Sequence, residues 1–261
     1  MKKSAMKSHE TCILTINAGS SSIKFALFQA GEAMERRLDG TIGRIGLPGT
    51  NLTFNDSTGN HQAGHSIGVS DYKSAAKFLI NWLEEHNSFK SVLAVGHRVV
   101  HGMKHTEPEL VTQALLDELH RISPYDPEHL PRGIKLIEAF RERHPKLPQL
   151  ACFDTAFHRT MPRVARVLPI PRRFDAKRAQ RHGFHGLSYT YLMEELACLG
   201  DPNASKGPCD PRASRQRRKS GCRARRSKHR HQHGLHPDSR DADEYPHRRS
   251  RSWTGLVSDA H

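Results

Sequence analysis

The amino-acid sequence predicts an α/β protein built on a mixed β-sheet. Between residues 12 and 69, short segments rich in β-branched and apolar residues alternate with Gly and Asn turns, which is typical of a β-meander. Beyond residue 70, apolar residues recur at helical spacing in several segments, and short apolar runs separate these segments. Strands followed by an alternation of strands and helices favour a mixed sheet with helices packed on it.

The expected elements follow in chain order. Cys12 to Ile16 and Ser21 to Phe28 are expected to form two strands joined by a tight turn. Further strands are expected at residues 36–45, 52–55, 61–69, 92–100 and 150–153. Helices are expected at residues 72–86, 110–122, 131–143 and 187–199. The third of these begins with Pro131, a residue that suits the first turn of a helix.

The charge and the low apolar fraction are concentrated at one end of the chain. The 261 residues carry a net charge of +14, and 36% of them are hydrophobic. From Pro208 to His261 there are 14 Lys and Arg residues against 6 Asp and Glu residues, and this tail contains no Ile, Phe or Met. Residues 1–207 are therefore expected to be globular, and the tail is expected to be disordered, because it lacks the apolar residues of a core.

Other sequence features bear on the cellular compartment. No run of about 18 apolar residues is present, so we expect no membrane-spanning helix. The basic start, Met1 to Lys3, precedes an apolar segment that is too short for a signal peptide. The five cysteines have no disulfide-framework spacing. These features predict a cytoplasmic protein.

The turn between the first two strands is the first candidate for chemistry. Gly19 allows close approach of a ligand to the backbone, and the N–H groups and hydroxyls of Ser20, Ser21 and Ser22 can cradle phosphate oxygens. Asn17 ends the first strand, where its side chain can reach a metal-bound water, and Lys24 can reach a phosphate as a point charge. An ordinary serine-rich hairpin is the alternative interpretation.

Three further positions follow strands or precede a helix. Arg98 ends an expected strand and can hold a small carboxylate with its guanidinium fork, although an arginine there can also form a surface salt bridge. Asp154 follows the next strand, where an aspartate often caps a helix. His185 precedes the last expected helix, and a lone histidine is more often structural than catalytic.

Four strings carry a resemblance to a known family. They are Thr15 to Phe28, the Gly-His-Arg-Val-Val-His-Gly string around Arg98, Phe-Asp-Thr-Ala-Phe-His around Asp154, and Gly-Phe-His-Gly around His185. Together they resemble acetate kinases, which belong to the superfamily of sugar kinases and actin, and the resemblance covers residues 12–207. It implies an actin-like, ribonuclease H-like ATPase fold, with the first domain and the start of the second present.

The resemblance also implies site residues and partners. It places Asn17 at magnesium, and Lys24 with Ser20, Ser21 and Ser22 at the phosphates of ATP. Arg98 would contact acetate, and Val100 and Phe184 would line the pocket of its methyl group. Asp154 would orient the carboxylate nucleophile or assist proton transfer, and His185 would stabilise the transferring phosphoryl group. The implied reaction converts acetate and ATP to acetyl phosphate and ADP with Mg²⁺, in a homodimer without membrane or nucleic-acid partners.

Two segments depart from the family pattern. Pro124 to Pro127 reads Pro-Tyr-Asp-Pro where the family usually has Pro-Leu-His-Asn-Pro. Gly186 to Tyr189 reads Gly-Leu-Ser-Tyr where the family has Gly-Thr-Ser-His. Both lie near the acyl site by analogy, so propionate or butyrate remains open as the substrate.

The basic tail has several interpretations. It can be a nucleic-acid-binding arm of a non-catalytic protein, a flexible linker, or a metal site formed by its His and Cys residues, although their spacing fits no standard zinc pattern. We prefer a fourth interpretation, in which the tail is coding sequence translated out of frame after residue 207. In the shifted frame, residues 208–221 can encode R-V-I-L-A-H-L-G-N-G-A-S-L-A, and residues 229–249 can encode T-D-T-S-M-G-F-T-P-T-A-G-M-P-M-S-T-R-T-G-D. Both strings resemble acetate kinases.

This interpretation fixes the expected domains and activity. We expect a flexible N-terminus at residues 1–11, an N-terminal domain at 12–150, the start of a second domain at 151–207, and an out-of-frame tail at 208–261. By the resemblance, residues that contact nucleotide phosphates and stabilise the transition state are then missing. The chain as written is expected to be unstable and inactive.

Overall fold

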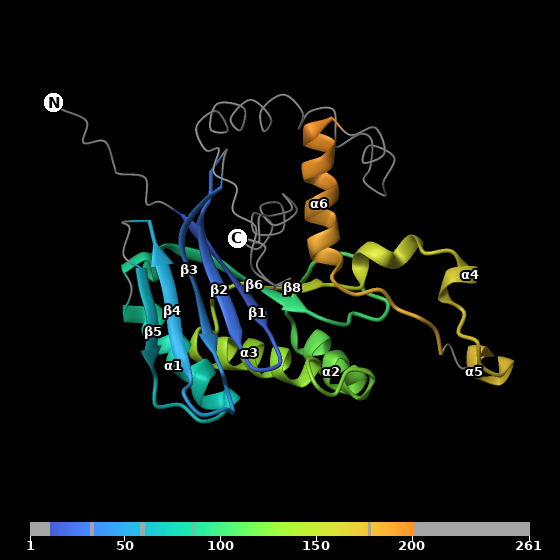
Figure 1. Cartoon of the computed structure of the whole chain (residues 1–261), viewed down its shortest axis with the longest axis horizontal. Coiled ribbons are helices and arrows are strands. Elements are labelled where there is room, and N and C mark those ends of the chain that lie inside the picture. Colours follow the sequence, from blue (N-terminus) through green and yellow to red (C-terminus); the bar gives the residue numbers. More distant parts are fainter. Residues whose placement is uncertain (1–10, 32–33, 58–60, 86, 177–178, 201–261) are drawn as a thin grey trace, which may run out of the picture. The chain divides into compact units, whose positions relative to one another are not determined.

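The computed structural model describes residues 11–200, except residues 32–33, 58–60, 86 and 177–178 (Figure 1). Most of the expected N-terminal segment and the whole of the expected tail lie outside the described residues. The described chain forms two compact units that divide between Thr155 and Ala156, and each is considered by itself below. The expected domain boundary after residue 150 falls within a strand of the first unit.

The first unit is organised around one mixed sheet, as the sequence predicts. Its strand order in the described residues is β5-β4-β3-β2-β1-β6-β8-β7. Strands β1 to β5 pair as antiparallel neighbours, whereas β6 pairs in parallel with β1 and with β8. The strands are β1 (Cys12–Ala18), β2 (Ile23–Gln29), β3 (Glu35–Gly43), β4 (Asn51–Asp56), β5 (His61–Ser66), β6 (Val92–Val99), β7 (Glu109–Leu110) and β8 (Gln149–Phe153).

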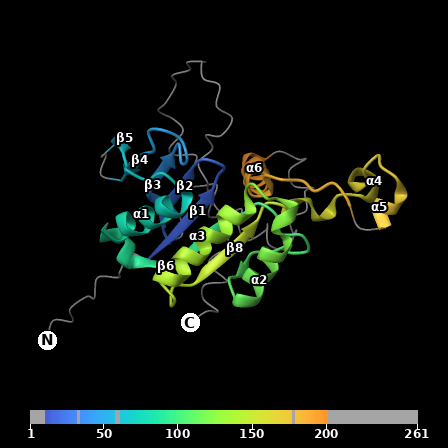
Figure 2. The same cartoon turned by 90° about the horizontal axis from the view of Figure 1, so that it is seen from below.

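Two helices cover one face of this sheet. The helices of the first unit are α1 (Tyr72–Glu85), α2 (Gln113–Ile122) and α3 (Leu130–Arg143), with short 3-10 helices η1 (Asn87–Ser91) and η2 (Ser123–Tyr125). Figure 1 shows α1 and α3 below the strands, and Figure 2 shows the same two helices side by side as seen from below. Leu79 of α1 and Phe140 of α3 are completely buried in one cluster with Leu14 of β1. Burying each such side chain stabilises the fold by about 2 kcal/mol.

Along β1, residues of the helix-covered core alternate with partly buried residues, and this distinguishes the two faces of the sheet. In β1 the even-numbered residues Cys12, Leu14, Ile16 and Ala18 belong to the helix-covered core, whereas Thr15 and Asn17 are only partly buried. Since successive side chains of a strand point to opposite faces, Asn17 lies on the face turned away from α1 and α3.

The structure corrects the start of one expected helix. The helix expected at residues 110–122 begins at Gln113, and Leu110 belongs instead to the edge strand β7. Thr112 sets this start, because its backbone is extended and its side-chain oxygen accepts a hydrogen bond from the N–H of Leu115 at 3.2 Å. This is an N-cap, which satisfies one of the free N–H groups of the first turn.

A buried histidine joins β6 to β8 and α3. His97 is 2% exposed, and its ring packs edge-on against Phe140. The side-chain amide of Gln149 lies 2.8 Å from Nε2 of His97 and also reaches the carbonyl of Ile137 and the N–H of Arg141. Burial lowers the pKa of His97 to about 4, because the protonated ring would lose its hydration in this core.

This histidine should make the stability of the first unit depend on pH. The folded-state pKa lies below the unfolded value of about 6.5, so the stabilisation is complete above that value and is lost as the pH falls towards 4. Between pH 7 and pH 5, we expect His97 to account for a loss of about 2 kcal/mol in the free energy of unfolding. Urea unfolding of the chain and of His97→Gln at both pH values measures this; an equal pH dependence in the two proteins would contradict it.

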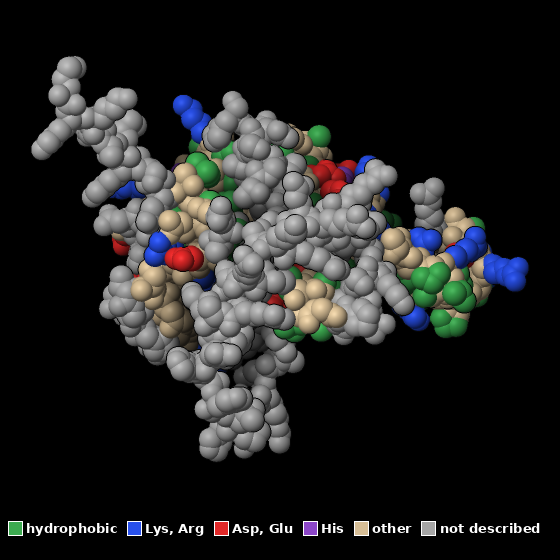
Figure 3. Space-filling model, turned by 90° about the horizontal axis from the view of Figure 1, so that it is seen from above, with side chains coloured by type: hydrophobic (Ala, Val, Ile, Leu, Met, Phe, Trp, Pro, Cys, Tyr) green, Lys and Arg blue, Asp and Glu red, His purple; other side chains and the backbone are tan. Residues whose placement is uncertain are grey.

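The second unit consists of short helices and one longer helix. It contains η3 (Ala156–Thr160), α4 (Arg163–Arg166), α5 (Arg172–Ala176) and α6 (Gly186–Leu199), of which only α6 was expected from the sequence. Figure 3 shows hydrophobic and basic side chains next to one another on the segment that carries α4 and α5. Val164 is 84% exposed there, and Leu199 at the end of α6 is 82% exposed. None of the described helices has the length and apolar composition required to cross a membrane.

Candidate active site

Four of the expected site residues lie in one row at the edge of the sheet where the parallel strands β1, β6 and β8 end. Asn17 of β1 is paired in register with Lys24 of β2 on one side and with Arg98 of β6 on the other. Arg98 is in turn paired with Cys152 of β8, and Asp154 follows two residues later. Directly paired residues project from the same face of a sheet, so Lys24, Asn17 and Arg98 line up on the face opposite α1 and α3.

Arg98 connects this row through hydrogen bonds. Its Nε and Nη2 donate to Oδ2 of Asp154 at 2.8 and 2.5 Å, and its Nη1 donates to Oδ1 of Asn17 at 2.9 Å. The Asp154 side chain is 1% exposed and that of Arg98 is 18% exposed. A guanidinium carries five N–H bonds, so two of them remain outside these contacts and are available to an anion.

The buried carboxylate of Asp154 also affects its neighbour. Cys152 is buried, and both the loss of hydration and the nearby negative charge of Asp154 raise the pKa of its thiol well above the ordinary value. Cys152 is therefore a neutral wall of the site, because a nucleophilic cysteine needs its thiolate form.

The turn that leads from β1 to β2 is closed by a hydrogen bond between its own backbone groups. The N–H of Gly19 donates to the carbonyl of Ser22 at 2.8 Å, and a Cβ atom at position 19 would lie 2.8 Å from Oγ of Ser22. A side chain at position 19 would therefore have to displace the hydroxyl of Ser22, whatever ligand the turn binds. The turn leaves Ser20 exposed and Ser21 and Ser22 partly buried, beside the end of the sheet that carries Asn17 and Lys24.

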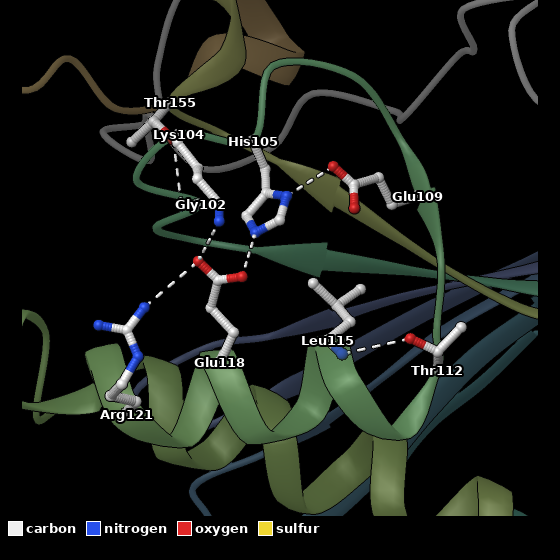
Figure 4. Close-up of polar contacts among 9 residues, drawn as sticks. All are labelled: Gly102, Lys104, His105, Glu109, Thr112, Leu115, Glu118, Arg121 and Thr155. Atoms are coloured by element: carbon white, nitrogen blue, oxygen red, sulfur yellow. Dashed lines mark hydrogen bonds and ion pairs between the residues drawn. The ribbon is translucent and has the colours of Figure 1, made fainter.

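A polar network holds the loop that follows β6 against α2 (Figure 4). His105 lies between Glu109, 2.5 Å from its Nδ1, and Glu118 of α2, 3.3 Å from its Nε2. Burial of Glu118 opposes its ionisation, but the hydrogen bond and charge of Lys104 and the charge of His105 outweigh this and lower its pKa. The ring of His105 also stacks on Phe153, the residue before Asp154.

The same loop carries the expected pocket residue Val100. Val100 directly follows β6 and is partly buried. Two residues later the N–H of Gly102 donates to Oγ1 of Thr155 at 3.1 Å (Figure 4). The loop is therefore tied at Thr155 and at His105, so the backbone on both sides of Val100 is fixed relative to Arg98 and Asp154. The sequence indicated neither anchor: Gly102 and Thr155 lie in recognised strings but nothing in those strings pairs them, and His105 and Glu118 lie in segments without a recognisable motif.

The two remaining site residues belong to the second unit. Phe184 is 40% exposed, and His185 is exposed and immediately precedes α6. His185 has a φ angle of 58°, in the left-handed region, which costs a non-glycine residue about 1 kcal/mol. Its carbonyl accepts the N–H of Tyr189 at 3.0 Å and so begins the helix. The free N–H groups of a helix N-terminus favour anions, so His185 stands at a position suited to phosphate.

The residues present offer a partial set of ligands for magnesium. Mg²⁺ prefers carboxylate and amide oxygens and keeps several of its waters. Asn17 and Asp154 supply such oxygens, but both accept hydrogen bonds from Arg98. Within the part of the chain that the structure describes, no group of three or more His, Cys, Asp or Glu side chains is arranged to hold a metal ion. Asn17 and Asp154 by themselves therefore do not form a complete ligand set for the ion.

Comparison with known proteins identifies the family of the chain. The model of the acetokinase family matches residues 12–206. The chain belongs to the acetokinase family. An acetate kinase of Methylocella silvestris is 40% identical over 196 residues, which are 71% of this chain and 48% of that protein. The chain thus spans about half the length of the curated relatives it matches.

Solved structures of the acetokinase family share the fold. An acetate kinase from Porphyromonas gingivalis matches with a TM-score of 0.64 and 27% identity, covering 73% of this chain and 49% of that one. A propionate kinase from Francisella tularensis matches with a TM-score of 0.64 and 30% identity, covering 72% of this chain and 49% of its own. The α/β fold expected from the resemblance is thereby confirmed.

The pair formed by Arg98 and Asp154 should dominate the stability of the site. Arg98→Met leaves a buried carboxylate without its cation, and we expect a loss of about 3 kcal/mol in the free energy of unfolding at pH 7. The double variant Arg98→Met/Asp154→Leu should recover much of that loss. Urea unfolding of the single and double variants measures this coupling.

The bidentate pair of Arg143 and Glu84 offers a matched control on the surface. Its two nitrogen–oxygen distances are both 2.7 Å, but the Arg143 side chain is 58% exposed. Water and salt screen such a pair, so its coupling energy should be clearly smaller than that of the Arg98 pair. Equal coupling energies for the two pairs would contradict the claim that burial strengthens the pair of Arg98 and Asp154.

Proposed function

We propose that the site residues serve phosphoryl transfer between ATP and acetate, giving acetyl phosphate and ADP. The observation that carries this proposal is the row of Lys24, Asn17 and Arg98 at the edge of the sheet where the parallel strands β1 and β6 end, with Asp154 buried against Arg98. Ligands of open α/β sheets bind outside this end of the strands. The cationic groups there suit an acid whose carboxylate accepts a phosphoryl group.

Arg98 is the proposed acetate-binding residue. Two N–H bonds of its guanidinium remain for a carboxylate after the contacts to Asp154 and Asn17. Asp154 holds the guanidinium in one orientation, which reduces the entropy lost when acetate binds. Val100 follows on the same segment and is the proposed contact for the methyl group of acetate.

The reaction needs no general base. Acetate is already ionised at neutral pH, so its oxygen attacks the γ-phosphorus directly while the bond to the β-phosphate oxygen breaks. No proton is taken up or released in this exchange. Asp154 therefore orients Arg98 and, through Arg98, the carboxylate nucleophile. Of the two roles expected for Asp154, we favour this orientation over proton transfer.

The transferring group requires cations and hydrogen-bond donors. The transition state spreads negative charge over the three equatorial oxygens of the phosphoryl group. His185 at the N-terminus of α6 is the proposed donor to these oxygens, and Phe184 is the second proposed pocket residue. Lys24 and the turn at Ser20, Ser21 and Ser22 are the proposed contacts for the phosphates of ATP.

Magnesium would neutralise phosphate charge when it is bound, and Asn17 would hold one of its waters. The amide oxygen of Asn17 is held in place by a hydrogen bond from Nη1 of Arg98, and an amide oxygen is a group that can accept a hydrogen bond from a metal-bound water.

We further propose that this chain is inactive as written. Residues 208–221 and 229–249 can encode family-like strings in another frame. These strings contain the glycine-rich segment expected at the nucleotide phosphates and the arginine expected to stabilise the transition state. Exposed apolar side chains on α6, including Leu192 at 40% and Leu199 at 82%, are consistent with low stability of the second unit.

An activity measurement tests both proposals. The purified chain should show no acetate-dependent formation of ADP from MgATP. Removal of one base near the codons of Gly207 and Pro208 should produce an active kinase, in which Arg98→Leu lowers kcat/KM on the order of a hundredfold. Activity of the unmodified chain would overturn the proposed inactivity. A frame-restored protein without acetate kinase activity would overturn the proposed function.

Propionate is the second candidate substrate, favoured by the likeness to the Francisella tularensis propionate kinase and by the departure at Pro124 to Pro127. The first two residues of that segment belong to η2, and Tyr125 is 69% exposed. The ratio of kcat/KM for acetate, propionate and butyrate in the frame-restored protein decides between the acids.

A further inference from the structure

We propose that His158 is a positioning residue that holds the backbone at Phe184 and thereby sets the left-handed conformation of His185. The inference rests on the proposed function only in assigning a catalytic role to His185. The contacts themselves lie entirely within the second unit, among residues that the structure describes.

The first contact is a hydrogen bond to the loop before α6. His158 belongs to η3, and its Nε2 lies 3.0 Å from the carbonyl oxygen of Phe184. A carbonyl can only accept, so Nε2 of His158 must carry the proton. This bond holds the peptide group that joins Phe184 to His185. The φ angle of His185 is set by how that peptide group is rotated about the N–Cα bond of His185.

The second contact is steric. The ring of His158 lies so close to Gly183 that a Cβ atom at that position would be 2.2 Å from Cγ of the ring. Only glycine lets the ring reach the loop, because any side chain at residue 183 would displace it. Gly183 and His158 therefore fit each other, and their contact fixes the loop one residue before Phe184.

The third contact holds the ring from the side of the helix. The rings of His158 and Tyr189 meet edge to face at 5.6 Å, and Phe157 stacks on Tyr189 at 5.6 Å. Tyr189 lies in the first turn of α6 and donates its N–H to the carbonyl of His185. His158 thus contacts the loop before His185 and the helix after it.

Together these contacts explain how a strained residue is held at this place. The side chain of His185 makes no capping hydrogen bond to α6, so it does not stabilise its own conformation. A sparsely populated backbone conformation persists only where its surroundings enforce it. His158 supplies that constraint, and it leaves the imidazole of His185 available for a ligand.

Two variants separate the hydrogen bond from the bulk of the ring. His158→Gln places an amide N–H near the position of Nε2, whereas His158→Asn is too short to reach the carbonyl of Phe184. We expect His158→Asn to move the 13Cα shift and the HN–Hα coupling of His185 away from left-handed values. His158→Gln should retain them, and His120→Asn, which changes a histidine of α2, should leave them unaltered.

The experiment is NMR on the full chain, with the amide signals of α6 as the measure of folding. Long-range 15N spectra of the His158 ring should show the tautomer protonated at Nε2. A ring protonated only at Nδ1, or equal His185 signals in the Asn and Gln variants, would overturn the proposal. Loss of the α6 signals in the Asn variant together with their retention in the Gln variant would support it.

The kinase assay keeps this inference distinct from the proposed function. In the frame-restored protein, His158→Asn should lower kcat about tenfold with little change in the KM for acetate, and His158→Gln should restore kcat. A protein that lacks kinase activity altogether overturns the proposed function but leaves the NMR result on His158 to stand. Normal kcat in the Asn variant would overturn the positioning role.

Discussion

The buried ion pair between Arg98 and Asp154 is the interaction on which the candidate site depends. Asp154 is almost completely inaccessible, so its charge is tolerated only because the guanidinium of Arg98 donates two hydrogen bonds to it. The same guanidinium reaches Asn17 on the next strand. One side chain thereby links the ends of β1, β6 and β8. A carboxylate ligand of Arg98 would meet a cation that is already oriented and partly desolvated.

The sheet makes this pair possible. Parallel pairing of β1, β6 and β8 brings three carboxyl ends to one edge, and the register places Asn17 beside Arg98. The helices α1 and α3 cover the opposite face, where His97 and Phe140 are buried. Two neighbouring residues of β6 therefore lie in different environments: His97 is a neutral core residue, and Arg98 is a charged site residue. A shift of one residue in the register would exchange them.

Most of the sheet and the position of α1 could be predicted from the sequence, because their apolar patterns are local. The edge strand β7 could not, since two residues carry no periodicity and only Thr112 shows where the helix begins. The residues of the site were found as separate motifs, but the pairing of Arg98 with Asp154 joins positions 56 residues apart. The contact of His158 with Phe184 was missed for the same reason, because nothing in the string around either residue indicates the other.

The central claim is that Arg98 is fixed by Asp154 and presents its remaining N–H bonds to an anion. The most direct measurement is the 15N spectrum of the arginine Nε groups during a titration with acetate. We expect the Nε–H signal of Arg98 to be protected from solvent exchange before acetate is added and to shift as acetate binds. A signal that exchanges like that of an exposed arginine, or one that acetate leaves unchanged at saturating concentration, would contradict it.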